Sequence, residues 1–567
     1  MPQSPKMTVH VPKRSWRPLK KHNRLTGKCG TLVPVFCTEV IPGTKAYVRQ
    51  TLGVSLPPLV SDTYMSVSYK TEAFFVPARL LFGGAVDWFC QDSAPSISAP
   101  VNPGDPGTVV SNVPQLPIWQ LDLAGVGGSP GPDSSALDPG TLLDYLGVRV
   151  SSSGLSGSPA FLLNPLPALA YHMCFEWYYR SPLIQAHVFA MPSGKGPIIN
   201  DGVDYLAAML PYIHDGYKIF GDVDQGSGAT DSSLLADGVS LGSLRQRNFG
   251  FDYFTLGYPS NPGDNIKVQI SNNEFSINSL RAANSLTMFT ERNMLAGTRQ
   301  CDVVAARYGA DLSMGVAQMP VLLGTADYEV YNRGVSITTY GTDASEGGLQ
   351  PSSNPFAYQA GAGTRVGNAF AGGSDNIIDG FECNEHGYIM IIGSLVPRAC
   401  YGSGVRRYLR RYITGGSASI TELANPILQN VGYDVIKSEE LDSEVAAVQS
   451  GSIFAYTEKF NSFFNFEDEV HGLFREGSAL QSFVLQRNFA NAGNPVHLST
   501  NFLEIPTNFM DDITVTKQAI SNYGYELDYY VEGGFLVPLY KHSMPSLQDP
   551  AYEHGKPVAV HRGGFRF

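Results

Sequence analysis

The stretch Tyr388-Ile389-Met390-Ile391-Ile392 is an unbroken run of large apolar residues. The apolar region that contains it, residues 388–396, is shorter than the roughly 20 residues that a membrane helix needs. A strand that is apolar at every position is buried on both faces. The stretch therefore predicts a strand in the interior of the protein, covered on both sides.

Other segments alternate between apolar and polar residues. In residues 525–532, Tyr, Leu and Val alternate with mostly acidic residues, and residues 65–70 alternate in the same way with Ser and Lys. Because successive side chains of a strand point to opposite faces, both patterns predict strands with one buried face. Residues 32–40, which precede Ile41-Pro42-Gly43, predict a further strand that ends in a turn.

The composition agrees with an all-β protein. The chain of 567 residues has 59 Gly, 38 Pro, 29 Tyr and 30 Phe, and only 16% of its residues are charged. This profile is typical of a large β protein with long loops. Three regions interrupt the strand pattern, at about 91–160, 199–245 and 325–380, and we expect them to be insertions. Two helices are predicted, one from Ser276 and one over residues 166–180.

The first 28 residues differ from the rest of the chain. They contain eight Lys and Arg residues and no Asp or Glu, whereas the whole chain has a net charge of −12. Without these eight, 31 basic residues face 51 acidic ones, a net charge of −20. A basic arm on an acidic body predicts two surfaces with different partners. The arm could bind a polyanion, strap a neighbouring subunit, or do both.

Seven cysteines are present without a CxxC pair, which predicts reduced thiols in a cytoplasmic folding compartment. No apolar signal region follows the N-terminal charges, and we expect no contact with a membrane. The chain therefore has the features of a protein that is folded inside the cell that makes it.

Motifs of enzymes are incomplete in this chain. Residues 193–196 (SGKG) lack the first Gly and the Ser or Thr of a phosphate-binding loop. His554 and His561 have no partner at a metal-binding spacing. Residues 467–469 (EDE) favour a solvated face or a helix start over acid–base catalysis. We therefore predict a protein that is not an enzyme and has no cofactor and no metal.

Basic residues interleaved with aromatic ones remain as candidate nucleic-acid contacts. They lie in the arm, in a cluster around Tyr408 and Tyr412, and in the C-terminal tail. The candidates are Lys13, Arg14, Arg17, Lys20, Lys21, Arg24, Arg406, Arg407, Arg410, Arg411, Arg562 and Arg566. The arginine cluster could instead form salt bridges between subunits, and the tail could dock on a neighbouring subunit.

Several motifs, taken in their order along the chain, show a resemblance to a known family. They are 30–35 (GTLVPV) with 39–44 (EVIPGT), 74–80 (FFVPARL), 166–171 (LPALAY) with 176–180 (EWYYR), 252–255 (DYFT), 276–281 (SINSLR), 291–293 (ERN) with 297–299 (GTR), 386–388 (HGY) and 454–460 (FAYTEKF). Together they resemble the major capsid proteins of the Microviridae, small bacteriophages with single-stranded DNA, and in particular the gokushovirus-like members.

The resemblance implies an eight-stranded antiparallel jelly roll with long inserted loops and a few helices. It divides the chain into an arm (1–30), a capsid domain (31–540) and a tail (541–567). It also implies a T=1 icosahedral shell of identical subunits around circular single-stranded DNA, assembled in the bacterial cytoplasm. The implied partners are a small basic DNA-binding virion protein, a DNA pilot protein and a host surface receptor. In such a shell we expect the arm and part of the cluster 406–411 to face the interior or a subunit interface, and the insertions at about 199–245 and 325–380 to face outward.

Two other classes of function remain open from the sequence. One is an all-β glycan-binding or glycan-processing protein, which as an enzyme would need paired carboxylates in a cleft. The other is a DNA-binding structural protein that forms no shell. Electron microscopy would separate these classes, because a shell gives uniform round particles.

Overall fold

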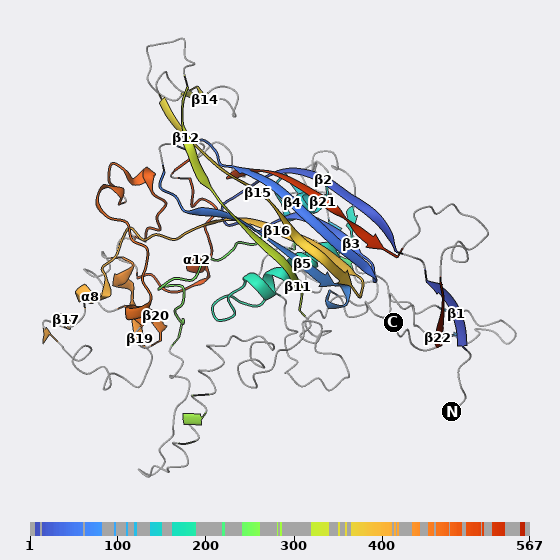
Figure 1. Ribbon diagram of the computed structural model, residues 1–567. Coiled ribbons are helices and arrows are strands. Elements are labelled where there is room, and N and C mark those ends of the chain that lie inside the picture. The colour runs from blue at the N-terminus through green and yellow to red at the C-terminus, as the bar shows by residue number, and fades with distance from the viewer. Residues whose placement is uncertain are drawn as a thin grey trace, which may run out of the picture.

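Figure 1 shows the computed structural model of the chain. It describes residues 14–59, 63–81, 137–149, 161–188, 241–260, 319–338, 364–410, 434–442, 452–458, 461–475, 477–489, 495–511, 513–514 and 524–538, and several further strand and helix residues outside these ranges. None of the helices in these residues is long and apolar enough to cross a membrane.

Two antiparallel sheets form the body of the protein (Figure 1). The four-stranded sheet consists, in spatial order, of β11 (Val321–Glu329), β5 (Val67–Pro77), β16 (Gly387–Pro397) and β3 (Val33–Val40). The five-stranded sheet consists of β12 (Tyr331–Thr338), β15 (Thr364–Cys383), β4 (Thr44–Ser55), β21 (Tyr525–Val537) and β2 (Ser15–Gly27). Side chains of both sheets share one hydrophobic core, so the sheets pack face to face. The prediction of an all-β protein is confirmed.

Strand β16 contains the apolar stretch and is buried on both faces, as predicted. Ile389 and Ile391 lie in the core between the two sheets. Met390 and Ile392 point the other way, into a second core under helix α3 (Leu166–Cys174). All four are at most 1% exposed, and each such side chain contributes about 1.5–3 kcal/mol by leaving water.

Strand β21 confirms the predicted alternation. Tyr525, Leu527 and Tyr529 lie in the core between the sheets, whereas Glu526 and Asp528 are exposed on the outer face. Because successive side chains of a strand point to opposite faces, these acidic residues lie on the outer face. There they lie beside side chains of the neighbouring strand β2.

The turn after β3 links the two sheets. Strand β3 ends at Val40 in the four-stranded sheet, and β4 begins at Thr44 in the five-stranded sheet. Between them Gly43 has φ +79°, in the left-handed region that only glycine adopts without strain. This turn was predicted from Ile41-Pro42-Gly43, and it carries the chain from one layer to the other.

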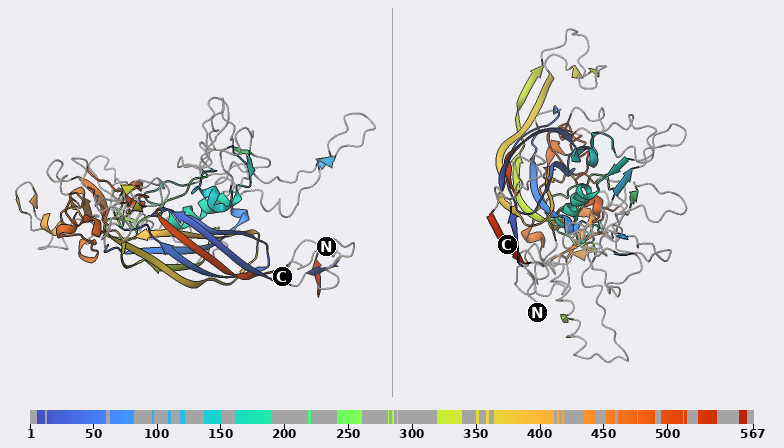
Figure 2. Two further views of the ribbon diagram at one scale, coloured as in Figure 1. Left: turned by 90° about the horizontal axis from the view of Figure 1, so that it is seen from above. Right: turned by 90° about the vertical axis from the view of Figure 1, so that its right-hand side faces the viewer.

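The helix predicted over residues 166–180 is present. Asn164 Oδ1 accepts a hydrogen bond from the N–H of Leu166 (3.0 Å), at the start of α3. The helix continues as the π-helical turn η5 (Phe175–Tyr179). It covers the face of the four-stranded sheet that points away from the other sheet (Figure 2). For the second predicted helix, only residues 281, 284, 285 and 288 are described, and they are helical; Ser276 lies outside the described residues.

The structure differs from the sequence expectation in two regions. Residues 15–27 were expected to belong to a separate arm, but β2 pairs with β21 along its whole length. Leu19 and Leu25 explain this, because they point inward and pack against the core. Residues 325–380 were expected to be an insertion, but they contain β12 and most of β15; β12 pairs with β15, and β15 pairs with β4. The ends of this hairpin extend beyond the sandwich (Figure 1).

Shorter elements surround the sandwich. The remaining strands are β1 (Lys6–Val11), β6 (Ser96–Ile97), β7 (Val109–Val110), β8 (Ile118–Leu121), β9 (Phe161–Leu163), β10 (Lys218–Phe220), β13 (Gln350–Pro351), β14 (Tyr358–Gln359), β17 (Ile413–Thr414), β18 (Ser417–Ala418), β19 (Asp434–Lys437), β20 (Ile453–Thr457) and β22 (Lys556–His561). The remaining helices are η1 (Ala78–Leu80), α2 (Leu142–Leu146), α8 (Arg407–Arg410), η6 (Ser438–Glu440), α11 (Asn461–Phe464), η7 (Gly472–Phe474), η8 (Gln481–Phe483) and α12 (Thr500–Leu503). Strands β1 and β22 pair with each other, which brings the two chain ends together.

Candidate subunit and nucleic-acid surfaces

Two basic residues of β2, His22 and Arg24, and Arg14 just before the strand are paired within the chain. Arg14 forms an ion pair with Glu382 at the end of β15. Arg24 Nε lies 3.5 Å from Asp528 Oδ1 on β21, and His22 also contacts Asp528. His22 and Arg24 together lower the pKa of the Asp528 carboxyl. Because β2 and β21 are antiparallel neighbours, their outward side chains meet in pairs of opposite charge.

The remaining described candidates of the arm lie on the same strand. Lys20 is exposed, Arg17 is half-buried, and the Lys21 ammonium lies 5.6 Å from the centre of the Phe36 ring. Lys20, His22 and Arg24 alternate with the inward-facing residues and share the outer face of β2. Because His22 and Arg24 lie beside Asp528, this face is not a purely basic surface. Lys13, Arg411, Arg562 and Arg566 lie outside the described residues.

The arginine cluster at α8 is also paired. Arg406 forms an ion pair with Glu469, and Arg407 forms one with Asp434. Arg407 also donates to the backbone carbonyl of Val435 (2.8 Å), so this arginine holds α8 against β19. Arg410 is the last residue of α8, and its side chain is not described. Of the acidic residues 467–469, Glu469 is thus a partner of the arginine cluster, whereas Asp468 pairs with Arg398.

Helix α3 and the turn η5 hold the residues on either side of the segment 189–240, which contains most of the insertion expected at about 199–245. The far side is fixed by His172, whose Nε2–H donates to the carbonyl of Leu241 (3.0 Å). The Nδ1 of His172 accepts from Arg245 Nε (3.1 Å). Burial, together with the nearby Arg245, lowers the pKa of His172 to about 3. His172 is therefore neutral at ordinary pH, in the one tautomer that satisfies both contacts.

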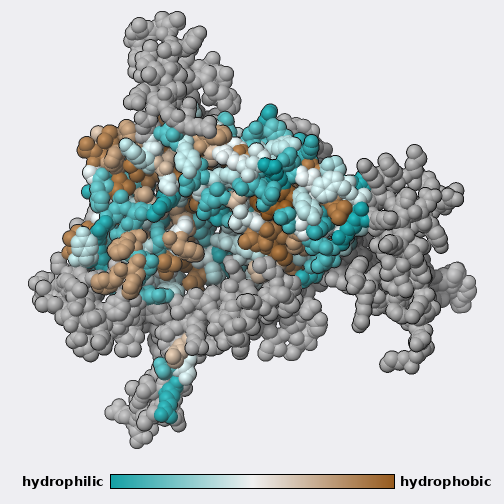
Figure 3. Space-filling model, viewed as in Figure 1, coloured by the Kyte–Doolittle hydropathy of each residue, from teal (hydrophilic) through white to brown (hydrophobic). Residues whose placement is uncertain are grey.

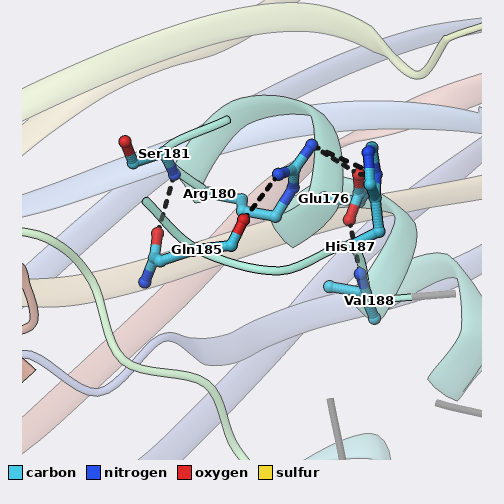
Figure 4. Close-up of polar contacts among 6 residues, drawn as sticks. All are labelled: Glu176, Arg180, Ser181, Gln185, His187 and Val188. Carbon is cyan, nitrogen blue, oxygen red and sulfur yellow. Dashed lines mark hydrogen bonds and ion pairs between the residues drawn. The ribbon is translucent and has the colours of Figure 1, made fainter. Parts of the chain in front are cut away.

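The near side of the segment 189–240 is held one helical turn away (Figure 4). Glu176 Oε2 accepts from the N–H of Val188 (2.8 Å), and Oε1 lies 2.9 Å from both Arg180 and His187. Glu176 and Arg180 are both 6% exposed. Arg180 and Gln185 complete the arrangement, since Arg180 Nη1 donates to the carbonyl of Gln185 (2.9 Å). Residues four apart lie on one helix face, so one face holds both ends of the segment 189–240.

A third core lies at the end of the sandwich near α12. The buried guanidinium of Arg487 lies over the rings of Phe502 (4.1 Å) and Phe249 (4.2 Å). It donates to the hydroxyl of Tyr401 (3.2 Å), and that hydroxyl donates to Asp252 Oδ2 (2.6 Å). The arrangement fixes the turn of residues 252–255, because Asp252 Oδ1 accepts from two backbone N–H groups of that turn.

Sequence reasoning missed Arg487, Arg180 and His172 as functional positions. Glu176 and Arg180 entered only as part of a motif, and Asp252 entered the same way. The partners of His172 and Arg487 lie far away in the sequence, so no local pattern could have shown those contacts. The spacing of Glu176 and Arg180, four residues apart on the predicted helix, is the one local signal that could have shown a pair.

Five of the seven cysteines lie in the described residues, and all five are free thiols. Burial raises the pKa of Cys37 to about 12 and that of Cys383 to about 12. These thiols are protonated at ordinary pH and therefore unreactive. Within the described part of the chain, no group of three His, Cys, Asp or Glu side chains could hold a metal ion.

Comparison with known proteins identifies the family. A model of the phage capsid protein (F protein) family matches residues 7–115 and 160–551. The chain belongs to this family of capsid proteins. The resemblance to Microviridae capsid proteins is thereby confirmed. The unmatched residues 116–159 lie within the insertion expected at about 91–160.

Two named relatives agree. The chain is 22% identical to "Capsid protein VP1" of Chlamydia phage 1, over 91% of this chain and 93% of that protein. It is 21% identical to "Capsid protein VP1" of Bdellovibrio phage phiMH2K, over 85% of this chain and 84% of that protein. The chain is thus a bacteriophage capsid protein and a component of a virion.

Proposed function

We propose that the chain is the subunit of a closed T=1 icosahedral shell around a circular single-stranded DNA genome. We also propose that its body is an eight-stranded jelly roll, in which β11 and β12, separated only by Val330, form one strand that passes from one sheet to the other. The observation that carries the proposal is the antiparallel two-sheet sandwich in a chain that matches a capsid family over most of its length. Packing two sheets protects strand edges, which suits a subunit that must assemble without aggregating.

The work of such a protein is assembly, with no catalytic step. In a closed shell each subunit makes several contacts at once, and symmetry makes weak contacts collectively stable. A chain of this kind needs preformed contact surfaces and a rigid body. The buried β16 and the fixed turn at Asp252 supply that rigidity.

The genome would be held without regard to sequence, through phosphate contacts of Lys and Arg and stacking on aromatic side chains. The pairing of Arg14, Arg24 and Arg406 with carboxylates limits what this chain alone can neutralise. A small basic virion protein is therefore expected to assist, together with a DNA pilot protein. We also propose assembly in the bacterial cytoplasm and outward-facing insertions that meet a host receptor.

Expression of the full chain in a bacterium, followed by electron microscopy of the purified material, tests the proposal. Uniform round particles with T=1 symmetry, which protect DNA from nuclease when they come from infected cells, are expected. Protein from infected cells that stays monomeric and never enters particles would contradict it.

A further inference from the structure

Two exposed phenylalanines flank a groove at one end of the four-stranded sheet. The groove has a volume of about 400 Å³ and is lined by the start of β5, the ends of β11 and β16, and the loops around residues 250–256 and 465–468. Phe251 and Phe466 both line the groove and are 89% and 75% exposed. Large apolar side chains at this exposure are unfavourable in water unless something covers them.

The groove is preformed, because the loops that carry both phenylalanines are attached to Tyr401. The Tyr401 hydroxyl donates to Asp252, the residue that follows Phe251. The backbone N–H of Tyr401 donates to the carbonyl of Asp468 (2.8 Å), two residues after Phe466. Arg487 holds the Tyr401 ring from behind. A site whose walls are fixed before binding loses little entropy when it is filled.

The turn that presents Phe251 is rigid as well. Tyr253 and Phe254, which follow it, are buried in the third core. Asp252 accepts from the N–H groups of Phe254 (3.0 Å) and Thr255 (2.8 Å). Phe251 therefore points outward because its neighbours are anchored. An exposed aromatic side chain on an anchored turn is suited to act as a binding hot spot.

Two ion pairs lie on the groove wall. Lys70 Nζ lies 3.2 Å from Asp327 Oδ2, and Arg398 forms an ion pair with Asp468. The floor is otherwise mixed, with serine and acidic side chains beside apolar ones. The groove thus combines exposed aromatic side chains with a polar surface, as interfaces between proteins commonly do.

More apolar surface continues from the groove. Leu256 lines it, and Phe464 is exposed beside Phe466 in the sequence. Figure 3 shows hydrophobic side chains on the side of the molecule where Figure 1 labels α8 and α12. A particle that must stay soluble outside its host cannot leave such a surface in water, so contact between subunits is the arrangement that covers it.

We propose that the groove between Phe251 and Phe466 is a contact surface for a second copy of this chain, which inserts apolar side chains between the two phenylalanines. The inference rests on the proposed function, because it names a surface through which the shell is built. It assigns to the turn of residues 252–255 and to Arg487 the role of holding that surface in shape.

The first test compares the wild-type chain with Phe251→Ser, Phe466→Ser and the double variant. Expression in bacteria and sedimentation give the particle yield, and thermal unfolding of the subunit fraction gives stability. We expect each single variant to reduce the particle yield at least tenfold without changing the melting temperature of the subunit, because exposed side chains contribute little to folding. The matched control Phe251→Leu keeps an apolar side chain and should assemble like the wild type.

The second test needs no variant. Hydroxyl-radical footprinting of wild-type subunits and particles should show Phe251 and Phe466 oxidised in free subunits and protected in particles. Serine variants that assemble normally, or phenylalanines equally oxidised in both states, would overturn the inference. If the wild-type chain itself forms no particles under any condition, the proposed function fails instead, and the two failures are thereby distinguished.

Discussion

Strand β2 and the groove end of the sandwich present opposite kinds of surface. On β2 the conspicuous cations lie beside carboxylates of the same chain, as Arg24 lies beside Asp528. At the groove, Phe251 and Phe466 are exposed on turns that the rest of the protein holds in place. One surface is satisfied in the isolated subunit, whereas the other gains free energy only when it is covered.

The difference shows where assembly energy can come from. A surface ion pair contributes about 0–1 kcal/mol, and most of that is already gained inside the chain. Burial of one aromatic side chain can contribute about 1.5–3 kcal/mol. Charge is the more visible feature of this sequence, but the aromatic end is the stronger candidate for subunit contact.

The largest difference in subunit stability is expected when an arginine is replaced at each of the two regions. Arg487→Leu should destabilise the subunit by about 3–5 kcal/mol, because the variant loses the contacts of the buried guanidinium with the aromatic rings and the hydrogen bond that it donates to Tyr401. Denaturant unfolding of the subunit measures the change. The matched control on β2, Arg24→Leu, should change stability by less than about 1 kcal/mol. Equal changes in the free energy of unfolding for both variants would contradict the proposed difference between the two regions.

Replacing a carboxylate should likewise destabilise the subunit far more at a buried ion pair than at a surface ion pair. Glu176→Gln leaves Arg180 buried without its counter-ion, which should cost about 3–5 kcal/mol. The control Glu382→Gln removes the surface partner of Arg14 and should cost about 0–1 kcal/mol. Chemical denaturation of both variants beside the wild type gives the two values. A tolerated Glu176→Gln would mean that the ends of the segment 189–240 are not held by this carboxylate.

The strands and the helix that the sequence predicts correctly share one property. In β16, β21 and α3 the apolar spacing is set by burial, so the pattern is visible locally. Ion-pair partners have no such pattern. Arg14 and Glu382 are 368 residues apart, and His22 and Asp528 are 506 apart, so only the folded chain brings them together.

Strands β12 and β15 were missed for a different reason. Residues 371–376 (AGGSDN) of β15 have the composition of a loop. They form a strand because β4 pairs with them along its length, and Ile377 and Ile378 anchor the segment in the core. Tertiary pairing overrides weak local propensity here. The groove was also missed, because exposure of Phe251 depends on how residues 252–255 are anchored.

Acid sensitivity should arise at His172. Its pKa in the folded chain is lowered to about 3 by burial and by Arg245, against about 6.5 when unfolded. A group whose folded pKa is depressed favours the unfolded state as pH falls. Stability should therefore drop between about pH 6.5 and pH 3, by up to about 1.4 kcal/mol per pH unit. Unfolding curves at several pH values check this, and His172→Gln should flatten the dependence. A wild-type curve that stays level over this range would contradict the assignment.

The smallest effect on stability is expected from the outer face of β2. Lys20→Gln combined with Arg24→Gln should change subunit stability by less than about 1 kcal/mol. If this face meets the genome, the salt dependence of DNA binding should become shallower, by about one in the log–log slope for each lost phosphate contact. An unchanged slope would mean that the outer face of β2 does not contact DNA and that the strand has only a structural role.

A reconstruction of the assembled particle by electron cryo-microscopy, at a resolution that shows side chains, tests the central claim most directly. The account predicts a T=1 shell in which apolar side chains of a neighbouring subunit lie between Phe251 and Phe466, while Arg24 still contacts Asp528 of its own chain. A shell in which both phenylalanines face solvent, with subunits joined instead through the β2 cations, would contradict it.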